Sequence, residues 1–200
     1  MKRTFARAAA AFSQLVNRLP DDRWADPGLG DWDLRSLVGH ASRSLITVDT
    51  YLDRPADTEQ LMSPHDYYLA TAAAAGADPT AVAERGRQAG LALGDHAAET
   101  VSVLARRVVP RVEAAGDPLI ETIAGGMRLS NYLPTRTFEL VVHSLDIAAA
   151  AAVDAPAFDE DLLAEVATLA ARIAVSQGRG VELILAMTGR RRLGDGFSVV

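Results

Sequence analysis

Glu139 and His143 form the most suggestive local pattern in this sequence, because a carboxylate and an imidazole stand four residues apart. Residues at that spacing lie on one face of an α-helix, about one turn apart. Both side chains can then reach the same metal ion, one with an oxygen and one with a nitrogen. The spacing leaves a second role open, since such pairs also occur as surface ion pairs or helix-stabilising contacts.

A metal site needs at least one more ligand, and the remaining candidates are three histidines, because the chain has no cysteine. His40 is the best placed of them, at the edge of the apolar stripe of a predicted helix. Gly39 beside it would let another element approach the backbone closely. A lone histidine in such a place is also typical of a hydrogen-bonded core residue. We interpret His65 and His96 as surface residues.

Two histidines and one carboxylate suit zinc foremost, and also iron, manganese or nickel. Three protein ligands leave positions open for water, which permits a catalytic arrangement. Asp146 follows His143 by three residues and could orient its imidazole as a hydrogen-bond acceptor.

The helices that must carry these side chains are predicted from apolar residues recurring at steps of three and four. We expect helices over residues 5–19, over 34–52 after an N-cap at Asp33, from Asp78 or Thr80 to Pro110, from about Pro134 to 152, over 159–177 and over 181–187. Gly86, Gly90 and Gly94 weaken the third helix and indicate bends or close packing. In the helix from Pro134, the predicted core stripe is Phe138, Val142, Leu145 and Ala149.

The remaining segments read as loops and short strands. Residues 21–30 and 56–79 are predicted connections, and a short helical turn is left open within the second. Residues 119–123 and 127–129 are predicted strands joined at Gly125-Gly126, and residues 197–200 are a predicted terminal strand. The fold class expected from this pattern is mainly all-α, with residues 1–200 as one domain.

Composition and charge narrow the classes of function. The net charge is −6 and no basic stripe stands out, so we expect no nucleic-acid partner. Arg190-Arg191-Arg192 is too short a cluster to indicate one. No apolar run approaches the ~18 residues of a membrane span, so we expect a soluble, cytoplasmic protein. The sequence leaves a monomer and a homodimer both open.

Three segments carry a family resemblance: residues 30–40 with Trp32 near the start, residues 133–146, and the chain end at 185–190 and 196–199. Together, and in this order, they resemble the mycothiol-dependent maleylpyruvate isomerase family. The resemblance implies a DinB-like four-helix bundle, here with a short hairpin before the fourth helix and extra C-terminal helices. It also implies a metal ion held by His40, Glu139 and His143 with water, and chemistry on the thiol mycothiol.

The same resemblance suggests roles for neighbouring residues. Arg136 would pair with an acidic group of the thiol or substrate, although a contact with Glu139 or a solvent-facing position is equally compatible with the sequence. Trp32 would wall the cleft or belong to the core. The isomerase carries an additional C-terminal domain that contributes to its active site, and this sequence shows no counterpart. We therefore expect thiol S-transfer to a small electrophile more than isomerisation.

Two further functions remain open at this point. The same ligands could activate a water for metal-assisted hydrolysis. Alternatively, the chain could be a non-catalytic binding or regulatory module, since no separate general base stands out. A serine nucleophile is disfavoured because the sequence has no G-x-S-x-G elbow.

Overall fold

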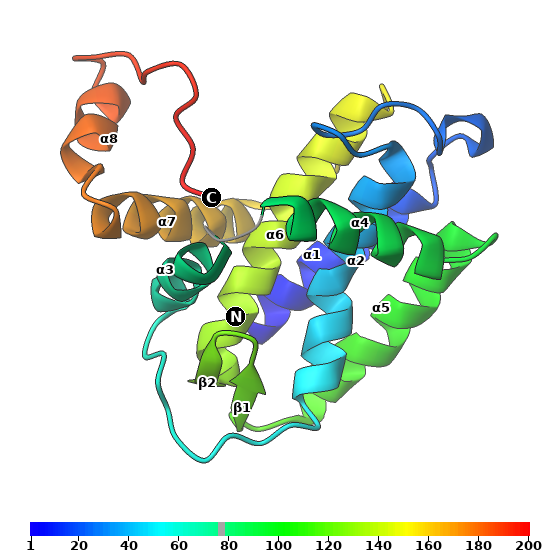
Figure 1. Ribbon diagram of the computed structural model, residues 1–200, viewed down its shortest axis with the longest axis horizontal. Helices are drawn as coiled ribbons and strands as arrows, with labels where there is room; N and C mark the ends of the chain where they lie inside the picture. The colour runs from blue at the N-terminus through cyan, green and yellow to red at the C-terminus, as the bar shows by residue number, and fades with distance from the viewer. Residues whose placement is uncertain (76–78) are drawn as a thin grey trace.

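A computed structural model describes residues 1–75 and 79–200, and in this part of the chain the protein is built almost entirely of helices (Figure 1). They are α1 (Lys2–Val16), α2 (Leu34–Tyr51), α3 (Pro64–Ala75), α4 (Pro79–Ala92), α5 (Ala97–Ala114), α6 (Leu129–Ala150), α7 (Glu160–Ser176) and α8 (Gly180–Met187). A short hairpin, β1 (Leu119–Thr122) and β2 (Gly125–Arg128), precedes α6. The predicted all-α class with a hairpin before a later helix is confirmed.

Four of the helices form the bundle that contains the core. Helix α1 packs against α5 and α6, and α2 packs against the same two helices. Large apolar side chains from all four are fully buried between them, among them Phe5, Phe12, Leu37, Leu45, Val108 and Leu140. Burying each such side chain contributes roughly 1.5–3 kcal/mol to stability. This bundle fixes the relative positions of α2 and α6, the two helices that carry the predicted metal ligands.

Helix α2 begins where the sequence predicts, because the carboxylate of Asp33 accepts a hydrogen bond of 2.7 Å from the backbone N–H of Ser36. Helix α4 then crosses α2 at very short range. A Cβ added to Gly39 would overlap the backbone of Gly90, so both positions need the absence of a side chain. The predicted close packing at the glycines of this region is therefore confirmed.

The long third helix predicted up to Pro110 is wrong, because the structure has two helices there. Helix α4 ends at Ala92, and Gly94 has a positive φ of 69° that breaks the helical path before α5. Helix α5 continues past Pro110 to Ala114, where Arg111 on its last turn makes an ion pair with Asp49 of α2. The predicted start at Asp78 or Thr80 lies in part outside the described residues, since 76–78 are not among them.

The prediction of an irregular connection over residues 56–79 is also wrong, because α3 occupies Pro64–Ala75. Ser63 precedes it and accepts a hydrogen bond from the backbone of Asp66, and Pro64 takes the first helical position. The alanines that follow are strong helix formers. This helix packs against α6 and α7 and brings two tyrosines to the bundle.

Helix α6 differs from its prediction at the start and in its buried face. It begins at Leu129, five residues before Pro134, and its first turn is capped by Asp117, which accepts hydrogen bonds from the backbone and hydroxyl of Ser130. The predicted core stripe is wrong in part: Phe138 is buried, but Leu145 is 45% exposed and Ala149 is exposed. The buried face instead contains Leu133, Leu140, Ser144 and Ile147.

The C-terminal helices α7 and α8 extend to one side of the bundle (Figure 1). Their predicted positions are confirmed within a residue or two at each end. The predicted strand over 197–200 is wrong, since that segment has no strand partner among the described residues. It is held instead by side chains, including Gln177, which donates to the carbonyl of Val199, and Arg179, which lies over the ring of Phe197.

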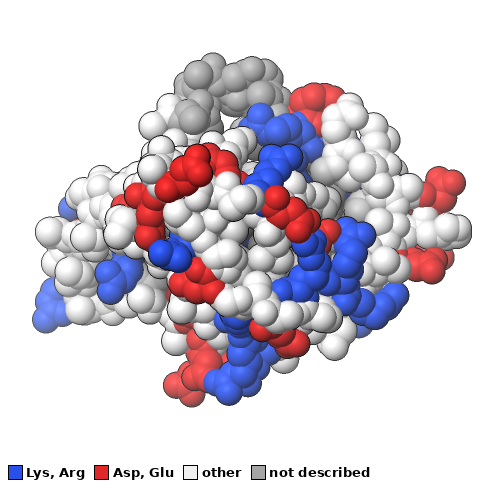
Figure 2. Space-filling view, turned by 90° about the horizontal axis from the view of Figure 1, so that it is seen from below, with Lys and Arg blue, Asp and Glu red and all other residues white. Residues whose placement is uncertain are grey.

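Acidic and basic side chains are intermixed on the face seen in Figure 2, and no single basic patch covers it. Charged side chains of neighbouring segments pair in the described structure: Asp49 of α2 accepts from Arg107 and Arg111 of α5, and Asp53, just after α2, accepts from Arg111. In the part of the chain that the structure describes, no helix combines the length and the apolar character needed to cross a membrane.

Candidate metal centre

His40, Glu139 and His143 come together between α2 and α6. Each offers a ligand atom, and these atoms all lie within 4.8 Å of one another. Glu139 and His143 stand one turn apart on α6, and the packing of α2 against α6 brings His40 to the same point. The imidazole rings of His40 and His143 meet edge to face with centroids 4.9 Å apart. All three side chains are partly shielded from solvent, so a surface ion pair does not describe this arrangement.

The geometry of the three side chains fits a metal ion. Oε2 of Glu139 lies 3.1 Å from Nε2 of His143. Ligand atoms about 2.0–2.1 Å from a tetrahedral ion lie about 3.3 Å from one another, close to that separation. The buried Nδ1 of His40 has no hydrogen-bond partner among the described residues. An unsatisfied buried nitrogen is costly, and coordination of a cation through Nδ1 would remove that cost.

The three groups have very different affinities for protons. Burial, helped by the charge of His143, lowers the pKa of His40 to about 4, which keeps this ring neutral at pH 7. Burial would raise the pKa of Glu139, but its hydrogen bond with His143 and the charge of Arg136 outweigh burial and lower it. Glu139 is therefore an anion, and one imidazole and one carboxylate of the cluster are already in the forms that bind metals.

Asp146 lies next to the imidazole of His143. Its Oδ2 is 3.1 Å from Nδ1 of His143, and Nε2 of the same ring faces Glu139. Burial lowers the pKa of His143, but the hydrogen bonds with Asp146 and Glu139 outweigh it and raise the pKa to about 9. A carboxylate on the far nitrogen of a ligating histidine is the usual way of fixing its tautomer and orientation. The contact is compatible with the orienting role expected of Asp146, which stays a prediction.

Trp32 packs against the imidazole of His40. Its ring is tilted against that of His40 with centroids 4.6 Å apart, and its Nε1 donates a 2.8 Å hydrogen bond to the carbonyl oxygen of Ala83 on α4. A Cβ on Gly86 would lie 2.5 Å from the indole, so α4 lies directly on the indole. Trp32 is half-buried and lies between α4 and His40. The sequence leaves open whether Trp32 lines a cleft or belongs to the core, and its observed position is intermediate between these two.

Arg136 is buried, with only 8% of its surface exposed, so the solvent-facing position is excluded. Its guanidinium lies over the rings of Tyr67 and Tyr132, at 4.9 and 5.1 Å from their centroids, and its Nε donates to the hydroxyl of Thr135. No ion pair between Arg136 and Glu139 occurs within 4.0 Å in the described structure. An arginine held between two tyrosine rings is stabilised by cation–π attraction while its terminal nitrogens keep their donor capacity.

Tyr68 touches the site directly and was not anticipated from the sequence. Its hydroxyl lies 2.9 Å from Oε1 of Glu139. Burial and the nearby Glu139 carboxylate raise the pKa of Tyr68 well above its usual range, so the hydroxyl keeps its proton at pH 7. No local spacing signals this contact, because Tyr68 precedes Glu139 by 71 residues and lies in a segment predicted to be irregular.

A family model, described as the mycothiol maleylpyruvate isomerase N-terminal domain, matches residues 5–148, well over half of the chain. The chain belongs to this family. No curated protein and no solved structure shows a significant match to it. The matched range contains His40, Glu139, His143 and Asp146, whereas α7 and α8 lie beyond it.

The other two histidines of this family member lie apart from the centre. His65 is at the start of α3, where a ring nitrogen is 2.9 Å from the hydroxyl of Ser63, and His96 precedes α5. Neither joins a group of potential metal ligands among the described residues.

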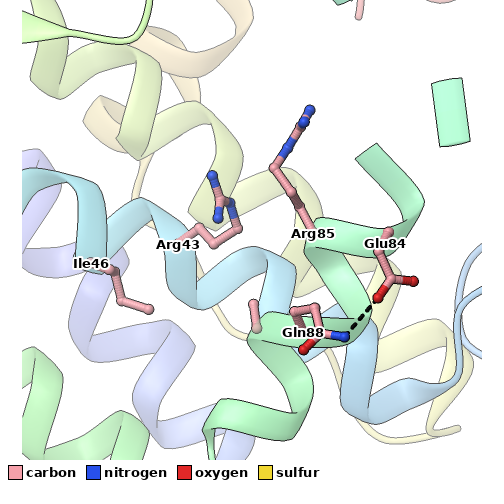
Figure 3. A pocket seen from close by; sticks show the side chains of 6 residues that line it. Arg43, Ile46, Glu84, Arg85 and Gln88 are labelled. Atoms are coloured by element: carbon pink, nitrogen blue, oxygen red, sulfur yellow. Dashed lines mark hydrogen bonds between the residues drawn. The ribbon is translucent and has the colours of Figure 1, made fainter. Parts of the chain in front are cut away.

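A pocket of about 520 Å³ opens between α2 and α4 (Figure 3). Arg43 and Ile46 line it from α2, and Arg85 and Gln88 are among the residues that line it from α4. The side chains of Arg43 and Arg85 point to the same side in Figure 3. This volume is large enough for a small organic molecule.

Proposed function

We propose that this protein is a metal-dependent thiol S-transferase that uses mycothiol on a small electrophilic substrate. The observation that carries the proposal is the convergence of His40, Glu139 and His143, whose ligand atoms lie within 4.8 Å of one another. Membership of a mycothiol-related family supports the choice of thiol. Zinc is the ion that two imidazoles and one carboxylate suit best, and three ligands leave a position free for a further one.

A divalent cation at this centre would supply one thing, the stabilisation of a deprotonated thiol at neutral pH. The chain's own residues do the rest. His40 and His143 contribute neutral nitrogens, and Glu139 contributes a negative oxygen that reduces the net charge of the centre. Asp146 holds the ring of His143 through Nδ1, and Trp32 limits the movement of the His40 ring.

Arg136 is the residue that we expect to bind an acidic group of the thiol or the substrate. The rings of Tyr67 and Tyr132 hold the guanidinium of Arg136 in place through its flat faces. The N–H groups at the edge of the guanidinium do not bond to these rings. A buried cation of this kind favours an anionic partner, because a guanidinium presents several donors in a fixed geometry. The nearby Arg43 adds positive charge to the same region, as its effect on the pKa of His40 indicates.

The pocket between α2 and α4 is the place that we propose for the electrophile, since Arg43, three residues after His40 on α2, lines it and its lining is both apolar and basic. In the reaction, the sulfur of the thiol forms a bond to an electrophilic carbon. The bond from that carbon to its leaving group breaks, the leaving group departs with the electron pair, and the thiol proton passes to solvent. No oxidant or reductant is required.

Metal content tests the centre itself. We expect the purified protein to bind one zinc ion per chain, and both His40→Ala and His143→Ala to bind much less. His65→Ala is the matched control, because it removes an imidazole outside the cluster, and it should keep full occupancy. Unchanged zinc content in either of the first two variants would reject that residue as a ligand.

Thiol conjugation tests the activity. The zinc-loaded protein is incubated with mycothiol and monochlorobimane, and the fluorescent conjugate is followed against a protein-free reaction. We expect faster conjugation with the zinc protein than with metal-free protein or with His143→Ala. Zinc bound without any acceleration, across several electrophiles, would eliminate S-transfer and leave a hydrolytic or non-catalytic metal site.

A further inference from the structure

The two oxygens of the Glu139 carboxylate face different partners. Oε2 lies 3.1 Å from Nε2 of His143, on the side of the three-ligand cluster. Oε1 lies 2.9 Å from the hydroxyl of Tyr68, which comes from α3. The carbonyl oxygen of Thr135 is also near that hydroxyl, at 3.1 Å. The single hydroxyl proton bonds more strongly to the charged carboxylate than to a neutral carbonyl.

The position of Tyr68 is fixed by burial and by contacts with two aromatic rings. Tyr68 is 8% exposed and meets Phe138 of α6 edge to face, with centroids 5.6 Å apart. The ring of Tyr67 also meets it edge to face, with centroids 5.8 Å apart. A buried tyrosine with these neighbours has little freedom to rotate, so its hydroxyl is held at Oε1 of Glu139 before any ion binds.

We propose that Tyr68 is a positioning residue that makes Glu139 a ligand through one oxygen only. A free carboxylate can bind an ion through one or both oxygens. The Tyr68 hydroxyl occupies Oε1 and leaves Oε2 for the ion, so one coordination position stays available for the thiol. This inference rests on the proposed metal centre and adds a residue from a third helix to it.

The test compares Tyr68→Phe with Tyr67→Phe. The two tyrosines are adjacent on α3 and similarly buried, and no hydrogen bond of the Tyr67 hydroxyl occurs in the described structure. Zinc affinity is measured by competition with a chromophoric chelator. We expect Tyr68→Phe to weaken zinc binding about 10–100-fold, the usual effect of losing a hydrogen bond to a ligand. Tyr67→Phe should stay within about twofold of the wild type, because it leaves that bond intact.

Cobalt substitution gives a second measurement that a purely structural role would not change. The visible absorption of Co²⁺ is strong in four-coordinate sites and weaker in five-coordinate ones. Freed from Tyr68, Glu139 can bind through both oxygens, so the cobalt form of Tyr68→Phe should absorb less per ion than the wild type and Tyr67→Phe. The same cobalt spectrum and the same zinc affinity in Tyr68→Phe as in the wild type would overturn the inference.

A double-mutant comparison separates this role from loss of packing. In a Glu139→Ala background, Tyr68→Phe should cause no further change in zinc affinity, because the hydroxyl acts through Glu139. An equal loss in both backgrounds would show that Tyr68 acts on the fold alone and would reject the proposal. If the wild-type protein itself binds no zinc, the metal centre fails as a whole, an outcome distinct from failure of the Tyr68 inference.

Discussion

At the scale of single residues, the three side chains of the candidate centre differ in the protonation state in which they would meet a cation. His40 is kept neutral by burial, and Glu139 is kept ionised by His143 and Arg136. His143 is held protonated in the metal-free protein, because its hydrogen bonds to Asp146 and Glu139 favour the cation. One proton therefore has to leave before all three groups can act as ligands.

The pKa of about 9 for His143 predicts that zinc binding at pH 7 releases about one proton per ion. Because that proton opposes binding below the pKa, zinc affinity should rise about tenfold per pH unit between pH 6.5 and 8. His40, with a pKa of about 4, adds no proton in this range. Calorimetric titration in buffers of different ionisation enthalpy measures the number of protons.

Asp146→Asn supplies the control for that measurement. It removes the charged acceptor at Nδ1 of His143, so the pKa of His143 should fall and fewer protons should be released at pH 8 than in the wild type. Zinc binding with no proton release at pH 7 in the wild type would contradict the prediction.

At the scale of elements, the centre depends on how closely α4 approaches α2. Gly39 and Gly90 let the two backbones meet, and Gly86 makes room for the indole of Trp32, which rests on His40. Helix α4 therefore supports a candidate ligand, His40, although it contributes none of the three candidate ligands itself. This explains why small residues occur on α4, where they would otherwise only weaken a helix.

Gly39→Ala should destabilise the protein, because the new methyl group would overlap the backbone of Gly90. Alanine is a better helix former than glycine by about 1 kcal/mol, so helix propensity alone would raise the stability of the variant. A loss in stability would therefore come from the overlap with α4. We expect the free energy of unfolding to fall by about 1–3 kcal/mol, measured by urea denaturation.

Gly116→Ala is the matched control, because a Cβ there meets nothing within 4 Å. It should leave the free energy of unfolding nearly unchanged or slightly raised. Equal stability of Gly39→Ala and the wild type would mean that α2 and α4 are further apart than the structure places them.

At the scale of the whole molecule, the three proposed ligands come from two helices that are far apart in the chain and packed in one bundle. His40 is on α2, whereas Glu139 and His143 are on α6. In the unfolded chain, the three side chains are not held together, so an ion that needs all three binds the folded state preferentially. Metal binding should therefore stabilise the entire bundle.

Free zinc at 100 times its dissociation constant should raise the free energy of unfolding by about 2.7 kcal/mol. Chemical denaturation with zinc and with a chelator measures this difference. His40→Ala should abolish most of the gain, because the remaining ligands are one turn apart on α6 and need no tertiary structure beyond that helix. A similar gain in His40→Ala would show that zinc stabilises the protein from another place.

The local elements of the fold were predictable wherever a short-range interaction determines them. The cap at Asp33, the turn at Gly125 and the four-residue spacing of Glu139 and His143 depend only on neighbours along the chain. Helix α3 was missed although Ser63 and Pro64 carry a recognisable start signal. The buried face of α6 was misplaced because both of its sides are apolar, and only its partners decide which side is covered.

The residue types and the helical spacing of the sequence were sufficient to indicate an all-α chain and a potential two-ligand face. The tertiary structure alone decided that His40 meets that face, that Arg136 lies between tyrosine rings and that Tyr68 bonds to Glu139. The reason is physical: contacts between distant segments depend on how whole helices pack, and no periodicity within one helix records which neighbour it will meet.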